Sequence, residues 1–413
     1  MHIAVGARLS LMMFLQFFVW GAWYVSVGVF MGERGLGGAI AWAYTVGPIA
    51  AIVSPFFLGM IADRFFASQR VLGALHLLGG AAMLAAPWAA AQGPRVFIAV
   101  LLLHMLCYMP TLALSNAVAF RNLADQEKQF PLVRVFGTLG WIAANLLVSA
   151  GFGADALPLQ FNVAGAAAIA LGLYSFTLPD TPPPAAGRRV SARDVLGLDA
   201  LALLRDRSFL VFLVSSFLIC IPLAAYYAFA PVFAESQGFE NTAATMSYGQ
   251  MSEVLFMLAM PLFFARLGVK WMLLAGMIAW VLRYGLFAGA AAQGVGALVI
   301  GGILLHGICY DFFFVTGFIY TDRKAGRDIR AQAQGMLVLV TQGLGLGIGA
   351  QVMGAVVKQF TAGGAAGGKV DWASVWLVPC IASLVVAALF FALFRDTRTP
   401  DEAPEGEAGG AAP

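Results

Sequence analysis

The chain has 413 residues, of which 61% are hydrophobic and 11% are charged, and its formal net charge is +3. A soluble domain carries roughly 25% charged residues, so this composition indicates a membrane protein. The sequence has no basic patch with interleaved aromatic residues, and we therefore expect no nucleic-acid partner.

Apolar runs of about 20 residues recur along the chain, each long enough to cross a hydrocarbon core of roughly 30 Å as a helix. They are too long and too unalternating for the strands of a membrane barrel, which leaves helices as the spanning structure. The first run is too long, and too poor in a cleavage signature, for a removable signal peptide. The sequence therefore predicts an all-α integral membrane protein. Its twelve expected transmembrane helices lie near residues 9–30, 38–61, 71–92, 96–119, 134–152, 160–178, 209–234, 245–265, 271–290, 294–318, 332–357 and 373–394.

A proline-rich and arginine-rich segment follows the sixth predicted span and divides the chain six spans to six. We expect an N-terminal half (1–178), a cytoplasmic linker (179–208), a C-terminal half (209–395) and a disordered tail (396–413) of proline, glycine, alanine and acidic residues. With the N-terminus inside, 18 of the 24 lysines and arginines fall in inside segments and 4 in outside segments. This bias predicts that both termini are cytoplasmic.

The two halves share a short repeat at the same position. The fourth predicted span contains "LLHMLCY", with His104 and Tyr108, and the tenth contains "LLHGICY", with His306 and Tyr310. Two six-helix halves of equal topology are typical of a transporter built from parallel repeats, whose substrate binds near the membrane midplane between the halves.

Residues 59–70 read "GMIADRFFASQR" and follow the second predicted span. They resemble the signature loop of the major facilitator superfamily, in which a glycine, an Asp-Arg pair and a later basic residue latch the cytoplasmic ends of helices. The resemblance assigns this latch to Gly59, Asp63, Arg64 and Arg70.

Glu253 lies in the middle of the eighth predicted span, three residues after Gln250. An ionisable side chain at membrane depth is costly and persists mainly where it faces a cavity or a partner. The spacing places both side chains on one helical face, where they would bind polar substrate groups, and Glu253 would exchange a proton. The alternative is a carboxyl group held by a neighbouring helix.

Asp311 in the tenth predicted span and Arg283 in the ninth lie at similar depth. We expect an ion pair between them, because helices adjacent in sequence usually touch. Two interpretations stay open. The pair either fixes helix packing, or Asp311 exchanges its arginine partner for a proton during transport.

The other candidate groups are aromatic or lie near a helix end. His306 and Tyr310 are four residues apart and share a face, which would stack on a flat ring or serve packing alone. Arg134 opens the fifth predicted span, with Thr138 and Trp141 after it, and is either an interfacial anchor or a ligand contact. The first span is unusually aromatic and polar for a lipid-facing helix, with Trp20 and Tyr24.

The four cysteines lie in apolar runs without a close pair, and the four histidines form no ligand cluster. Neither a disulfide framework nor a metal site is predicted, and no cofactor is expected. No phosphate-binding loop or catalytic triad order is present, so we do not expect an enzyme.

Taken together, several motifs closely resemble the nucleoside:proton symporter family, the bacterial nucleoside permeases of the major facilitator superfamily. They are "FLQFFVWGAWY", "CYMPTLALSN", "FPLVRVFGTLGW", "VLGLDALALL", "GQMSEVLFML", "VLRYGLFA", "YDFFFVTG" and "IRAQAQGM". The likeness covers residues 8–395.

The resemblance implies substrate contacts on three helices and proton coupling by Glu253 and Asp311. The implied substrate contacts are Arg134, Thr138, Trp141, Gln250, Glu253, His306 and Tyr310. One departure concerns the seventh span, where the family presents amide side chains and this chain has Ala224 and Tyr227, so Tyr227 joins the candidate contacts.

We therefore expect proton-coupled nucleoside uptake by alternating access. The expected location is the bacterial cytoplasmic membrane, and the expected partners are nucleoside, proton and the lipid bilayer, with the protein a monomer. The alternatives are a proton-coupled transporter of another polar ring, such as a sugar, and a membrane receptor or scaffold without transport.

Overall fold

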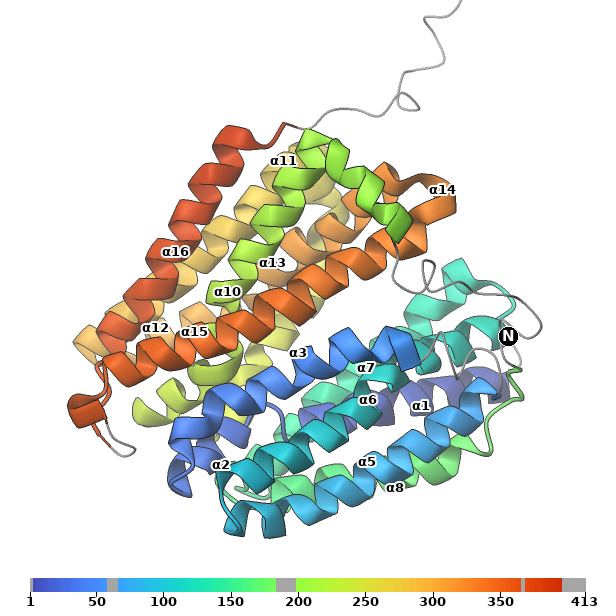
Figure 1. Ribbon diagram of the computed structural model, residues 1–413, viewed down its shortest axis with the longest axis horizontal. Coiled ribbons are helices and arrows are strands. Elements are labelled where there is room, and N and C mark those ends of the chain that lie inside the picture. Colours follow the sequence, from blue (N-terminus) through green and yellow to red (C-terminus); the bar gives the residue numbers. More distant parts are fainter. Residues whose placement is uncertain (1–2, 58–65, 183–197, 365–367, 396–413) are drawn as a thin grey trace, which may run out of the picture.

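The computed structural model of the protein describes residues 3–57, 66–182, 198–364 and 368–395. Within these ranges the regular structure is helical, apart from one isolated bridge between Thr361 and Val370. Figure 1 shows the helices in two groups, which correspond to the two predicted halves.

The N-terminal group contains the helices from blue to green at the lower right of Figure 1. A helix satisfies its own backbone hydrogen bonds, as hydrocarbon requires. Its elements are α1 (Ile3–Gly21), α2 (Val27–Glu33), η1 (Gly37–Ala39), α3 (Ile40–Phe57), α5 (Ser68–Ala91), α6 (Pro94–Asn122), α7 (Gln126–Leu146), the π-helical turn η3 (Leu147–Gly151) and α8 (Leu159–Ser175).

The C-terminal group follows a short 3₁₀ helix, η4 (Leu198–Arg205), which lies in the predicted linker. Two π-helical turns interrupt its helices, at η5 and η6. The elements are α10 (Arg207–Ser236), α11 (Thr242–Gln293), α12 (Gly296–Leu304), α13 (His306–Tyr310), η5 (Asp311–Val315), α14 (Thr316–Val338), η6 (Leu339–Gly345), α15 (Leu346–Gln359), η7 (Ala362–Gly364) and α16 (Trp372–Leu393).

Glycines at positive φ divide two of the helical stretches, α11 and α14. Gly268 in α11 has φ 67° and ψ −179°, and Gly326 in α14 has φ 65° and ψ −178°. Only glycine adopts this backbone conformation readily, so each marks a sharp reversal between two helices. The 52 residues of α11 are therefore the separate eighth and ninth predicted helices. Nine described helices are long and apolar enough to span a membrane, and α1 and α8 add shorter apolar helices.

The first predicted span is not one continuous helix in the structure. α1 ends at Gly21, residues 22–26 form turns, and α2 resumes at Val27. The Tyr44 hydroxyl donates to the Tyr24 carbonyl at 2.9 Å, which satisfies a backbone group in the interrupted segment. A Cβ on Gly21 would lie 2.9 Å from the Trp141 carbonyl oxygen, so glycine permits the close packing of α1 on α7.

The two halves meet at one end of the molecule. Gln351 of α15 donates to Thr45 of α3 at 2.8 Å, and a Cβ on Gly28 of α2 would lie 3.1 Å from Val232 of α10. Asp155, between η3 and α8, accepts from residues at the start of α11. Figure 1 shows the ribbons of the two halves diverging from this end toward the N-terminus.

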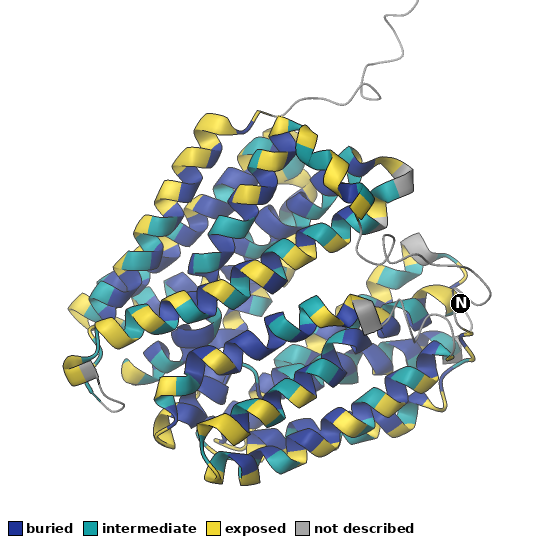
Figure 2. Cartoon of the chain, in the orientation of Figure 1, coloured by how far each residue is buried: buried dark blue, intermediate teal, exposed yellow. Residues whose placement is uncertain are grey.

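The outward faces of both bundles carry exposed side chains, whereas the facing surfaces within each bundle are buried (Figure 2). Many of the exposed side chains are large and apolar, such as Leu258 at 77% and Leu262 at 69% exposure. An extended apolar exterior is unfavourable in water and suits a lipid surface.

Candidate functional site

A cavity lies between the halves, with about 770 Å³ of empty space when the open solvent at its mouth is included. Both halves line the cavity, through α1 and α7 on one side and α10, α11, α13, η6 and α15 on the other. The lining residues are Phe17, Trp20, Tyr24, Arg134, Thr138, Trp141, Tyr227, Gln250, Glu253, His306, Tyr310, Gln342 and Leu346.

All eight substrate contacts expected from the sequence line this one cavity. They come from positions 134 to 310 of the chain, and the packing of the halves brings them together. The grouping makes a joint role in ligand binding physically possible, while their individual roles stay predictions.

Arg134 dominates the wall formed by the N-terminal half. Its guanidinium carbon lies 4.2 Å from the centroid of the Phe17 ring, a cation–π contact that holds the side chain over α1. Gly137 and Gly140 allow this arrangement: a Cβ would lie 2.6 Å from Arg134 Nη1 at the first and collide with the Phe14 carbonyl at the second.

Aromatic rings complete the same wall. The Trp20 ring contacts those of Tyr24, Tyr108 and Trp141 with centroid separations of 5.4, 5.5 and 5.5 Å. The indole nitrogens of Trp20 and Trp141 are buried without a hydrogen-bond partner among the described residues. These rings offer flat apolar faces to a ligand, and their indole donors are unused in this conformation.

Gln250 and Glu253 both line the cavity from α11, as their spacing predicts. The Glu253 side chain is 19% exposed, and its Oε2 lies 3.8 Å from His306 Nε2. Gln250 Oε1 is buried and has no hydrogen-bond partner in the described part of the chain. The acceptor on Gln250 is therefore unused in this conformation.

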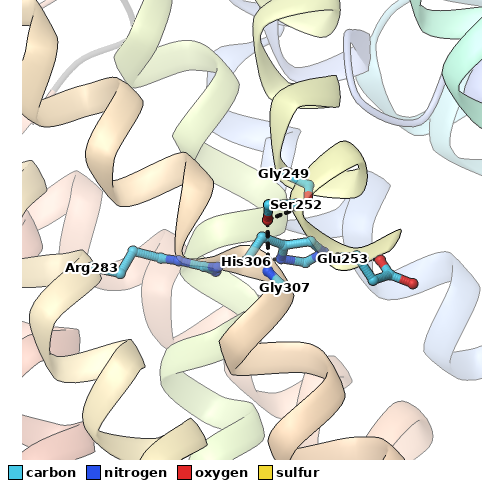
Figure 3. Close-up of polar contacts among 6 residues, drawn as sticks. All are labelled: Gly249, Ser252, Glu253, Arg283, His306 and Gly307. Atoms are coloured by element: carbon cyan, nitrogen blue, oxygen red, sulfur yellow. Dashed lines mark hydrogen bonds and ion pairs between the residues drawn. The ribbon is translucent and has the colours of Figure 1, made fainter. Parts of the chain in front are cut away.

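His306 lies at the centre of the C-terminal wall (Figure 3). Its ring stacks on Tyr226 with centroids 5.2 Å apart and planes 17° apart. The residue is 3% exposed, yet it lines the cavity, since its Nε2 edge faces Glu253. Tyr310 lies one turn along and lines the cavity beside it.

The predicted ion pair between Arg283 and Asp311 is wrong for this conformation. Arg283 instead donates from Nε to the Gly302 carbonyl at 3.1 Å, and its Nη2 lies 3.3 Å from His306 Nδ1. Neither Asp311 carboxylate oxygen has a hydrogen-bond partner among the described residues. The reason is the direction of the side chains around the helix axis. At about 100° per residue, Asp311 lies roughly opposite Gly302 on the tenth helical pass, so Arg283, which contacts Gly302, faces away from Asp311.

The first-half copies of the repeat occupy structural positions. His104 Nδ1 lies 2.9 Å from the Gly79 carbonyl oxygen, and the Tyr108 hydroxyl donates to the Gln16 carbonyl at 2.7 Å. Gly59, Asp63 and Arg64 of the predicted latch lie outside the described residues, as do residues 183–197 of the linker and the tail from 396. Arg70 is exposed on α5.

Three contributors to the site were not singled out from the sequence. The Phe17 ring makes the cation–π contact with Arg134. Gln342 and Leu346 line the cavity from η6 and α15. Residues 341–350 are rich in glycine at four-residue spacing, which suggests packing alone. The amide of Gln342 at membrane depth is the signal that distinguishes this segment from a packing surface.

Two six-helix bundles around a central cavity, with charged and aromatic side chains from both, define a solute transporter of the major facilitator type. Residues 1–399 match the family model described as "Nucleoside H+ symporter", and the chain belongs to this family.

The chain is 41% identical to YegT of Escherichia coli strain K12 over 406 residues, covering 95% of this chain and 94% of that protein. It is 31% identical to "Xanthosine permease" of the same organism, covering 97% and 98% of the two chains. The crystal structure of the nucleoside transporter NupG superposes with a TM-score of 0.85 at 30% identity, covering 96% of this chain and 100% of that one. These findings confirm the predicted fold, the family and a transport function without enzyme activity.

Proposed function

We propose that this nucleoside:proton symporter binds its nucleoside in the cavity between the halves, in contact with Arg134, Gln250, Glu253 and His306. The supporting observation is the convergence of these groups, from both halves, on one cavity. Family membership disfavours the alternatives of sugar transport and of a scaffold without transport.

The cavity offers two kinds of recognition. Trp20, Trp141 and Tyr227 present aromatic surfaces, on which a nucleobase stacks. Arg134, Gln250 and Glu253 supply hydrogen-bonding groups for the polar edge of the base or for the ribose hydroxyls. The preference among nucleosides then follows from which of these groups each base satisfies.

Glu253 and Asp311 carry the proton in this proposal. Glu253 borders the cavity and is reached by both water and ligand. Asp311 is 0% exposed, and its two oxygens have no hydrogen-bond partner in the described part of the chain. An ionised carboxylate in such surroundings is strongly unfavourable, so Asp311 is protonated in this conformation and releases its proton when the halves move.

With both termini cytoplasmic, as the sequence predicts, the conformation corresponds to the inward-facing state. The halves are joined at the end that carries Asp155 and the start of α11, and they diverge toward the N-terminus. With cytoplasmic termini, the closed end faces outward and the ligand leaves toward the cytoplasm. The family places the protein in the bacterial inner membrane, and we propose that one chain is the transporting unit.

Reconstituted proteoliposomes provide the test. We expect an inward proton gradient to drive accumulation of labelled uridine or adenosine, and unlabelled nucleoside to support counterflow. Asp311→Asn should abolish accumulation. Sugar uptake in place of nucleoside uptake would contradict the assigned substrate. Full accumulation by Asp311→Asn would contradict its assigned role in coupling.

A further inference from the structure

Arg283 is a buried cation that the proposed transport mechanism does not use. The side chain is 0% exposed, and no carboxylate lies within ion-pair distance of it among the described residues. Its surroundings are the Gly302 carbonyl, the Tyr226 ring, 4.0 Å from Cζ to the centroid, and His306 Nδ1. Burying a charged group costs free energy, and Arg283 contacts His306, which lines the cavity. This contact therefore indicates a functional role for Arg283.

The contact with Arg283 determines where His306 carries its proton. A guanidinium group can only donate hydrogen bonds, so the nitrogen that it approaches at 3.3 Å must act as the acceptor. Nδ1 of His306 is therefore unprotonated and the ring is neutral, which places the ring proton on Nε2. An imidazolium ring would also place a second cation next to Arg283, a repulsion that burial strengthens.

Nε2 is the nitrogen that faces Glu253. It lies 3.8 Å from Glu253 Oε2, longer than a direct hydrogen bond of about 3 Å. A donor and an acceptor thus stand side by side at the cavity wall, each able to bind a different atom of one ligand. Figure 3 shows Arg283, His306 and Glu253 in a row, each from a different helical pass.

Helix packing fixes this row. Gly307 N donates to Ser252 Oγ at 3.0 Å, and a Cβ on Gly307 would lie 2.6 Å from the Ser252 carbonyl oxygen. A Cβ on Gly249 would likewise lie 3.0 Å from His306 Cβ. The glycines therefore bring the two helices close enough to place His306 beside Glu253.

We infer that Arg283 is a positioning residue that holds His306 as the neutral Nε2–H tautomer, so that His306 donates a hydrogen bond to the substrate beside the acceptor Glu253. The inference deepens the proposed function and depends on it for the identity of the ligand. The tautomer itself can be examined without any ligand.

The other copy of the repeat supplies an internal reference for the tautomer. Nδ1 of His104 lies 2.9 Å from the Gly79 carbonyl oxygen, which can only accept, so His104 carries its proton on Nδ1. The two histidines of the repeated "LLH" therefore hold opposite tautomers. The difference arises from the third helix of each half, which presents a carbonyl in one case and an arginine in the other.

Nitrogen-15 NMR of histidine-labelled full-length protein tests the tautomers, with His306→Gln and His104→Gln used for assignment. We expect His306 to show a protonated Nε2 and an unprotonated Nδ1, and His104 to show the reverse. In Arg283→Met, His306 should populate both tautomers. A protonated Nδ1 on His306 in the unaltered protein, in either a neutral or a charged ring, would overturn the inference.

Uptake measurements then distinguish positioning from structural support. Glutamine at 306 places an amide donor near the position of Nε2 and needs no arginine to set a tautomer. Arg283→Met should lower the rate of nucleoside uptake about tenfold in the presence of His306 but less than about threefold in the His306→Gln background. Equal losses in the two backgrounds would show that Arg283 only supports the fold.

Lys270→Met is the matched control. Lys270 lies on the same helix as Arg283 and donates to the Phe391 and Phe394 carbonyls, away from the cavity, so its loss should have the same effect in both backgrounds. Rates are compared per folded protein. If Arg283→Met does not fold, Arg283→Gln serves in its place, because its amide both donates and accepts and no longer forces one tautomer. Without nucleoside uptake by the unaltered protein, the proposed function fails, while NMR still decides the tautomer.

Discussion

Replacing Asp155 with alanine should shift the protein away from the conformation seen here. Asp155 belongs to the N-terminal half and is 5% exposed. Its Oδ2 accepts from Ser149 Oγ at 2.6 Å, and across the interface from Thr242 Oγ1 at 3.1 Å and Ala243 N at 3.4 Å. The residue preceding α11, Asn241, makes no capping bond with its own side chain. Asp155 therefore caps α11 from the other half of the molecule.

The size of the effect follows from this capping role. Loss of a helix cap costs about 0.5–2 kcal/mol. These interactions exist only while the halves are joined at this end. We therefore expect Asp155→Ala to favour the separated state by about 1–2 kcal/mol, which is a shift of roughly 5–30-fold in the equilibrium.

Distance measurements between spin labels provide the assay. Labels at Arg34 and Gln293 lie at exposed positions on the two halves, near the joined end. The partly exposed Cys380 is replaced so that it does not react. Asp155→Ala should increase the population at long distances.

Asp371→Ala is the matched control, because Asp371 caps α16 within its own half by accepting from Ser374 N at 3.2 Å. The control should leave the distances unchanged. Identical distributions for Asp155→Ala and Asp371→Ala would refute the reasoning.

Four further predictions concern the interface, the cavity and the packing beneath it. Burial raises the pKa of Asp155, although hydrogen bonds from Ser149 and Thr242 oppose the shift, so the joined state binds a proton at higher pH than the separated state. Acidification through the range above the ordinary pKa of about 3.9 should therefore favour the joined state in the spin-label assay, and Asp155→Asn should remove this dependence. Glu253→Gln should abolish nucleoside accumulation under an inward proton gradient but retain counterflow, because the amide keeps an acceptor and cannot release a proton; accumulation at the unaltered level would refute this. Arg134→Lys retains the charge but loses the planar contact with Phe17, and we expect about tenfold weaker nucleoside binding by calorimetry. Unchanged affinity would show that Arg134 is an interfacial anchor and does not contact the ligand. Gly140→Ala should lower the unfolding temperature, since its Cβ would collide with the Phe14 carbonyl; overpacking costs about 1–3 kcal/mol, and an unchanged unfolding temperature would contradict the observed contact.

The sequence was sufficient for the number of helices and for the position of most boundaries. Long apolar runs must form helices in lipid, and Gly268 and Gly326 mark reversals even where the helical stretch is otherwise continuous. The break after Gly21 was not predicted. It depends on a hydroxyl from Tyr44 and on close packing against α7, and neither can be read from the local sequence.

The candidate residues could be named because polar groups at membrane depth are rare. Glu253, Gln250 and Arg134 stand out in apolar surroundings, and all of them line the cavity. The partner of Arg283 was predicted wrongly. The depth of a residue in the membrane does not specify the direction in which its side chain points around the helix axis. Arg283 contacts the face of the tenth helix that carries Gly302 and His306.

The class of protein, the two similar halves and the set of side chains able to carry chemistry follow from the sequence alone, because hydrocarbon tolerates few unpaired backbone groups and few charges. Which of these side chains touch follows from how the helices pack. That choice depends on helix rotation and on glycines that let backbones approach, as Gly307 does at Ser252, and those are properties of pairs of helices.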